Sequence, residues 1–297
     1  MKKSLTVIAA SILLSACNKA QPPATDTHAE PDTQLQTDGV QDTQRKSWQT
    51  VFFDDFDTFD ENNWRDQILW VNDEDQCYVR DGAHGTREVS DGSLKLRVVD
   101  LGEKQPCDNM DKHGNQHYDT QYVAGRISSK NRQEFSKGRW TARLRVKDSG
   151  QDGMFPAWWI LGAYNNEPPV EEPDETICWP MTGSGEIDIF EHHSDGGPDH
   201  YAARTIKNEG ACDKGDWQSL MLVQQATLAD YNEYAVEWRD NDIVFLLNGT
   251  EVYRNEGIGD ELAEPMFAIL NFAKINKAAM TQTWEMEVDW VKWEAWQ

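Results

Sequence analysis

The chain has 297 residues, with 52 acidic against 28 basic side chains and a formal net charge of −24 at pH 7. So acidic a protein is unsuited to nucleic acid, which binds basic patches, and a neutral polymer is a simpler partner than a strongly sulfated one. Its 13 tryptophans provide flat apolar rings on which sugars can stack.

Residues 1–16 are predicted to be an export signal. Lys2-Lys3 precede an apolar stretch from Leu5 to Leu14, which is too short to cross a bilayer as a mature helix. The stretch ends in Leu14-Ser15-Ala16-Cys17, which resembles a bacterial lipobox. Cleavage before Cys17 would leave its thiol as the lipid attachment site, and the attached chains would bind a membrane. The alternative is an ordinary signal peptide with a chance cysteine.

The mature protein is expected to be an exported lipoprotein of the outer membrane. Asn18 follows Cys17, whereas lipoproteins retained at the inner membrane typically carry Asp there. After the lipidated cysteine, residues 17–47 are rich in Gln, Thr, Asp and Pro and cannot bury enough apolar surface to fold, which predicts a disordered tether. All 13 tryptophans fall in residues 48–297, whose length fits one domain, and we expect a monomer.

Four cysteines remain for the exported domain, where disulfides persist. They allow three connectivities. We favour Cys77–Cys107 and Cys178–Cys212, because each bridge would close a nearby loop. No C-x-x-C spacing indicates zinc.

The pattern of apolar residues predicts an all-β domain. Trp140–Val146, Ile243–Leu247 and Thr250–Tyr253 read as strands, and few segments show helical spacing over three turns. Asn248-Gly249 lies between two of these strands and is typical of a type I′ hairpin turn. We therefore interpret the Asn-x-Thr sequence at this point as a turn and not as a glycosylation site.

Residues 186–191 read Glu-Ile-Asp-Ile-Phe-Glu, an acidic strand with apolar neighbours. Residues i and i+2 of a strand share a face, so Glu186 and Asp188 would point the same way. Glu191 would join them if a β-bulge at Ile189 or Phe190 added one residue. Crowded carboxylates raise one another's pKa, which is what an acid that cleaves a glycosidic bond requires. A Ca²⁺ site or a merely acidic strand face is the alternative.

The segment Gly185–Glu191 resembles the signature of glycoside hydrolase family 16, in the bulged form of its laminarinase-like members. The resemblance is collinear over about 250 residues, from Val51 to Trp296. It implies a β-jelly-roll sandwich of two curved antiparallel sheets, like that of concanavalin A. Further matching segments are Gly125–Ser129, Gly138–Arg143, Phe155–Leu161, Tyr234–Trp238, Ile269–Ala273 and Met286–Val291.

The resemblance also implies roles for the acids and for one tryptophan. Glu186 would be the nucleophile, Asp188 would modulate its charge, and Glu191 would be general acid and then general base. Trp159 matches the family tryptophan beside the subsite next to the cleaved bond, with Trp158 facing the other way. Packing of Trp159 in the core is the alternative.

Other expected substrate contacts are less uniform. Asn72 and Arg126 fall where the family places polar sugar contacts, and Phe155 replaces the family's usual tryptophan. Arg204 and Lys207 introduce cations where the family has a different stretch, and they could recognise sulfate or uronate groups.

We expect a retaining, endo-acting hydrolase of β-1,3-glucan or mixed-linkage β-glucan, with no cofactor required for catalysis. The alternatives are a hydrolase of a marine galactan, such as an agarase, carrageenase or porphyranase, and a surface glycan-binding protein without catalysis. Asp55 and Asp289 resemble family positions that could hold a structural Ca²⁺.

Overall fold

The structure is a computed structural model that describes residues 46–297 apart from 194–196, 224–225 and 263. The predicted signal peptide, Cys17 and most of the tether therefore lie outside the described residues. Within the part that is described, no helix is long and apolar enough to cross a membrane. The regular helical segments there are two short 3₁₀ turns, η1 (Ala83–Gly85) and η3 (Gly259–Leu262).

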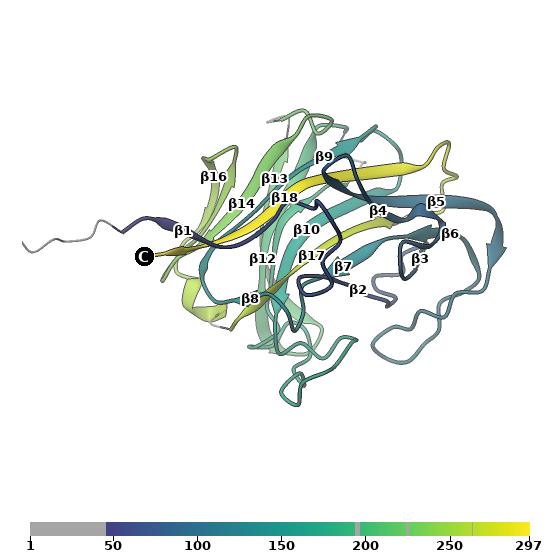
Figure 1. The fold of residues 1–297 in the computed structure, drawn as a ribbon. Coiled ribbons are helices and arrows are strands. Elements are labelled where there is room, and N and C mark those ends of the chain that lie inside the picture. The colour runs from purple at the N-terminus through teal and green to yellow at the C-terminus, as the bar shows by residue number, and fades with distance from the viewer. Residues whose placement is uncertain (1–45, 194–196, 224–225, 263) are drawn as a thin grey trace, which may run out of the picture. The chain divides into compact units, whose positions relative to one another are not determined.

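Two β-sheets stack on each other, which confirms the predicted jelly-roll sandwich (Figure 1). Among the strands that the structure describes, all pairs are antiparallel except β3 with β6, which are parallel. The first sheet has the order β16 (Thr250–Asn255), β15 (Ile243–Leu247), β14 (Asn232–Trp238), β9 (Gly138–Lys147), β18 (Trp284–Trp296), β5 (Ser93–Gln105), β6 (Thr120–Ala124), β3 (Cys77–Tyr78), with β1 (Trp48–Asp54) on β18 and β4 (Arg87–Ser90) on β5.

The second sheet carries the functional residues discussed below, and we call it the cleft sheet. Its order is β13 (Lys214–Val223), β12 (His200–Ala211), β11 (Glu186–Glu191), β10 (Met154–Gly162), β17 (Met266–Lys274), β7 (Arg126–Ser128), β2 (Arg65–Asp66), with β8 (Glu134–Phe135) on β17.

Alternating side chains of the two sheets form the core between them. On β9, every second residue from Trp140 to Val146 is buried. Strand β10 contributes Trp158 and Ile160, which are also fully buried. The rings of Trp140 and Trp158 meet edge to face with centroids 6.0 Å apart, a favoured aromatic geometry. The period of two thus leaves the other face of β10 free for the cleft.

The turn at Asn248-Gly249 joins β15 to β16 as predicted. Both residues have positive φ, 50° and 76°, as a type I′ turn requires. The Asn248 side chain is used within the fold, because its Nδ2 donates to Asn232 Oδ1 at 2.9 Å.

Both favoured disulfides are present. Cys77–Cys107 ties β3 to the loop of residues 106–119, and Cys178–Cys212 ties the loop of residues 163–185 to the turn between β12 and β13. We call these segments loop 106–119 and loop 163–185.

Both of these loops also contact the turn between β12 and β13. Lys112 of loop 106–119 forms an ion pair with Asp213 in the β12–β13 turn. The Asp213 amide in turn donates to the carbonyl of Trp179 in loop 163–185 at 2.9 Å. The two disulfide-tethered loops and the hairpin turn are therefore joined to one another beside the cleft sheet.

Candidate active site

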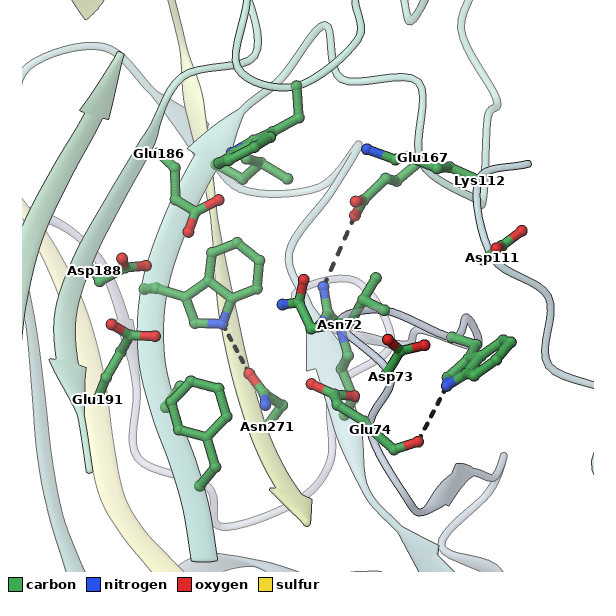
Figure 2. Close-up of a pocket in the computed structure, with 18 of the residues that line it drawn as sticks. Asn72, Asp73, Glu74, Asp111, Lys112, Glu167, Glu186, Asp188, Glu191 and Asn271 are labelled. Carbon is green, nitrogen blue, oxygen red and sulfur yellow. Dashed lines mark hydrogen bonds and ion pairs between the residues drawn. The ribbon is translucent and has the colours of Figure 1, made fainter. Parts of the chain in front are cut away.

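A cleft of about 480 Å³ lies over the cleft sheet (Figure 2). Strands β10, β11 and β17 supply its floor, and loop 106–119 and loop 163–185 supply lining residues around it. Apolar rings and acidic side chains are interspersed along the lining, as in pockets that bind sugars through both stacking and hydrogen bonds.

Strand β11 turns Glu186, Asp188 and Glu191 into this cleft, with Asp188 between the two glutamates (Figure 2). On β10, Trp159 pairs with Asp188 and Trp158 pairs with Phe190, so Ile189 has no partner there. The pairing with β12 shifts in the same interval, between Asp188 and Glu191. Ile189 is thus the extra residue of the predicted bulge.

The bulge also explains how all the acidic side chains of β11 can face the cleft while its apolar side chains face the core. Ile187, Ile189 and Phe190 all pack in the core between the sheets, which holds the strand in place. In a regular strand Glu191 would point into the core between the sheets. The apolar side chains there offer a carboxylate no hydrogen-bond partner, so its burial would cost free energy.

The environment raises the pKa of all three acids. Burial raises the pKa of Glu186 to about 7, and the charge of Glu191 adds to the rise. Burial and the charge of Glu186 raise the pKa of Asp188 well above its usual range. Burial and the charge of Asp188 do the same for Glu191, while the Arg204 guanidinium opposes the rise. The site therefore holds protonated carboxyl groups near neutral pH, as general acid catalysis requires.

Trp159 lies beside these acids and is only partly buried, unlike Trp158. Its Nε1 donates to Asn271 Oδ1 at 2.8 Å, a bond drawn in Figure 2. The guanidinium of Arg126 lies 5.0 Å from the centroid of the Trp159 ring. Trp159 thus faces the cleft, and Trp158 faces the other way, as predicted.

The other expected contacts of the cleft also line it. Asn72, Phe155 and Arg126 are all among its lining residues. The Phe155 ring packs on His193 with centroids 4.3 Å apart. Arg126 is 1% exposed and donates from Nε to Gln67 Oε1 at 2.9 Å.

Several residues that line the cleft were not among the predicted site residues, and these include Glu74, Glu167, Trp179 and Trp217. Burial raises the pKa of Glu74 to about 7, although Arg126 opposes the rise. Asn72 and Asp73 form a turn with positive φ, so the alternation of a strand could not have indicated Glu74. Trp179 and Trp217 lie edge to face, with centroids 6.1 Å apart. They come from segments that the sequence does not place together.

The structure corrects the expectation for Lys207. Its ammonium group pairs with Glu261 and lies 3.9 Å from Asp216, and it does not line the cleft. Arg204 faces the acids, but as an ion-pair partner of Glu191 at 3.0 Å and not as a free cation for substrate. The two residues are three apart on β12, so they lie on opposite faces of the strand.

The expected calcium ligands fit a cation poorly. The carboxylate of Asp289 forms an ion pair with Arg143, which repels a metal ion. Asp55 Oδ1 accepts the amide of Asp57 at 3.3 Å. Among the residues that the structure describes, no group of three or more His, Cys, Asp or Glu side chains could hold a metal.

Comparison with known proteins adds a family and a fold. Residues 97–292 match the sequence profile described as glycosyl hydrolases family 16. A glucan endo-1,3-beta-glucosidase A1 of Niallia circulans is 26% identical over 193 residues, which are 62% of this chain but only 24% of that protein. A beta-glucanase of Rhodothermus marinus is 26% identical over 244 residues, 76% of this chain and 75% of that protein.

A solved structure shares the fold. A LamA variant from Z. galactanivorans, in complex with laminaritriose and laminaritetraose, has a TM-score of 0.70 and 23% identity. The match covers 84% of this chain and 100% of that chain.

Proposed function

The chain belongs to glycoside hydrolase family 16, and from this premise we propose that it is a retaining, endo-acting β-glucanase of β-1,3-glucan or mixed-linkage β-glucan. One observation carries the proposal: the bulge at Ile189 turns three acids of β11 toward a cleft beside Trp159. The two curated relatives, named for the hydrolysis of glucans, support the substrate.

In the first half of the reaction, Glu186 is the nucleophile. Its carboxylate attacks the anomeric carbon of the sugar stacked at Trp159, and the bond to the leaving oxygen breaks. Glu191 gives its proton to that oxygen, so the aglycone leaves as an alcohol. Glu186 is left as a neutral ester with the sugar, and Glu191 is left as a carboxylate.

In the second half, water attacks the same carbon from the side that the aglycone has left. Glu191 takes a proton from the water, and the ester bond to Glu186 breaks. Asp188 lies between the two glutamates, and its carboxyl group interacts electrostatically with both of them throughout the reaction. Two inversions at one carbon give net retention.

The charges around the cleft favour a neutral polymer. Glu74, Glu167 and three aspartates (Asp73, Asp111 and Asp213) line it in addition to the catalytic acids. Of the lysines and arginines among its described lining, Lys112 pairs with Asp213 and Arg126 lies 4.0 Å from Glu167. An anionic galactan would therefore meet more carboxylates than available cations.

Two buried atoms suit a sugar hydroxyl. In the described part of the chain, Arg126 Nη2 and Glu167 Oε2 have no hydrogen-bond partner, although they are buried. Such groups cost free energy unless something satisfies them. A hydroxyl between them could accept from Arg126 and donate to Glu167, which supports Arg126 as a substrate contact.

Reducing-sugar release tests the proposal. The protein and its Glu186→Gln variant are assayed on laminarin, lichenan, agarose, κ-carrageenan and porphyran. We expect activity on a glucan that the variant lacks, with oligosaccharides of several lengths appearing early. Activity on a galactan alone would overturn the substrate but keep the chemistry. Binding without hydrolysis on every polymer would make the protein a glycan-binding member of the family.

We also propose that the protein is exported and anchored to the outer membrane through Cys17. The lipobox-like Leu14-Ser15-Ala16-Cys17 supports this. In a bacterial host, labelled palmitate should enter the wild type and appear in the outer-membrane fraction, and the Cys17→Ser variant should take up none. Equal labelling of both would contradict the proposal.

A further inference from the structure

Arg204 and Glu191 meet across neighbouring strands of the cleft sheet. Arg204 lies on β12, opposite Asp188 in the strand register. Its Nη1 is 3.0 Å from Glu191 Oε2, and the two side chains are 18% and 10% exposed. The guanidinium also lies 5.7 Å from the centroid of the Trp217 ring, which covers it. Among the described residues, Glu191 is the one carboxylate in an ion pair with Arg204.

This contact is a charge interaction without a well-aligned hydrogen bond. Glu191 Oε2 is 3.0 Å from Arg204, yet it has no hydrogen-bond partner within the described residues. The oxygen is therefore near a permanent positive charge while its lone pair remains available for a proton. A guanidinium stays protonated at any working pH, so the influence is constant.

The other charged groups that face Glu191 act in the opposite sense. Asp188, on the same strand, disfavours a second negative charge, and Glu186 lies beyond it. Strand β10 places the apolar Ala157 opposite Glu191. His193, two residues further on, packs against Phe155. Arg204 is thus the cation that β12 supplies against the acidic side of the site.

The balance of these influences changes during the proposed reaction. Before it, Glu186 and Asp188 add negative charge, and a protonated Glu191 is favoured. Once Glu186 has become an ester, one negative charge is gone. The attraction of Arg204 then weighs more, and the ionised Glu191 is favoured.

We propose that Arg204 is a positioning residue that holds Glu191 in its ionised form during the second half of the reaction, when Glu191 must accept the proton of water. The proposal rests on the proposed function. In that step the water oxygen bonds to the anomeric carbon, the ester bond to Glu186 breaks, and the water proton moves to Glu191. Arg204 acts through its contact with the Glu191 carboxylate and not by binding the sugar or the water.

Arg204→Gln and Arg204→Lys test this, because glutamine removes the charge and lysine restores it. The control is Lys207→Gln on the same strand, since Lys207 pairs with Glu261 away from the cleft. The substrate is an aryl glycoside of a glucan oligosaccharide with a good leaving group, which needs no acid in the first half. On it we expect Arg204→Gln to lower kcat by about tenfold, a part of what a general base contributes, with kcat/KM almost unchanged.

Two further readouts separate this role from a structural one. Added azide, a nucleophile that needs no general base, should restore kcat of Arg204→Gln and release a glycosyl azide. Arg204→Lys should recover most of the wild-type kcat. An equal loss in kcat and kcat/KM, without rescue by azide or by lysine, would overturn the proposal and make Arg204 structural or a substrate contact.

A measurement without substrate keeps the proposal separate from the proposed function. Carboxyl ¹³C NMR titration, with the Glu191 signal assigned by Glu191→Gln, follows the pKa of Glu191 directly. Loss of the Arg204 charge should raise that pKa, because the ionised form of Glu191 loses a neighbouring positive charge. An unchanged pKa would overturn the inference, even in an active enzyme. An inactive wild type with the expected shift would instead overturn the hydrolytic function alone.

Discussion

The indole of Trp159 is fixed in the cleft by Asn271, which accepts its Nε1 hydrogen at 2.8 Å. Asn271 lies on β17, and its own side chain is held in place because its Nδ2 donates to the hydroxyl of Tyr78 on β3 at 3.3 Å. The plane of the ring, and so the sugar face it can stack on, depends on a residue 112 positions away in the sequence.

Loss of the Trp159 ring should weaken substrate binding. Stacking on an aromatic ring contributes about 1 kcal/mol beyond its area, so Trp159→Ala should raise KM by about fivefold. Asn271→Leu leaves the ring but frees its orientation, and we expect a smaller rise in KM. Steady-state kinetics on laminarin measure both. Larger losses for Asn271→Leu than for Trp159→Ala would contradict this hierarchy.

The activity should depend on pH through two carboxyl groups. Burial places the pKa of Glu186 at about 7, and the nucleophile must be ionised, so kcat/KM should rise as the pH passes that value. Glu191 must be protonated, and burial raises its pKa well above the usual range, so kcat/KM should fall once the pH is high enough to ionise it. In Glu191→Gln, assayed on an aryl glycoside with a good leaving group, the alkaline limb should disappear and the limb near 7 should remain.

The same burial makes Glu186 a source of instability above neutral pH. Its pKa is about 7 in the folded protein against an ordinary 4.5, so the folded state binds the proton more tightly. The free energy of unfolding is therefore greatest below pH 4.5 with respect to this group, and it falls as the pH rises to 7. We expect Glu186→Gln to be more stable than the wild type by about 1–2 kcal/mol at pH 8.

Chemical denaturation at pH 8 and pH 4 measures that difference. The gain should vanish at pH 4, where the carboxyl is protonated in both states. Asp55→Asn, at an exposed aspartate, is the matched control and should change stability at neither pH. A gain that is equal at both pH values would point to packing instead of ionisation.

Removal of the Cys178–Cys212 bridge should affect both stability and activity. The bridge closes a loop of 34 residues, so Cys178→Ser with Cys212→Ser should lower the free energy of unfolding by about 3 kcal/mol. It also fixes Trp179 next to the turn that precedes Trp217, and kcat/KM should fall at temperatures where the protein remains folded. Thermal unfolding and kinetics on the same samples separate the two effects.

Features set by local chemistry could be predicted from the sequence. Asn248-Gly249 can form the type I′ turn without help from the rest of the fold. The bulge could be placed because Glu186, Asp188 and Glu191 occupy the first, third and sixth positions of the segment, so that regular alternation would turn Glu191 away from the other two acids. The family resemblance added Trp159 and Arg126, which the structure places in the cleft.

Features that depend on contacts between distant segments of the chain could not be predicted from the sequence. Glu74 acquires its burial because the segment around it packs against β17, where the Asp75 amide donates to the Lys274 carbonyl at 2.8 Å. The prediction of Lys207 as a substrate contact was wrong for a simpler reason. Lys207 is three residues from Arg204 on one strand, so the two side chains lie on opposite faces of that strand. The phase of a strand decides which residues reach a cleft.

The two disulfides fasten loops around the cleft and leave the strands of the sandwich to be held by their own core. A chain that has folded before oxidation would therefore have its sheets in place while the cleft walls are still loose. Reduction of the two bridges should therefore loosen the walls of the cleft while the sandwich keeps its core.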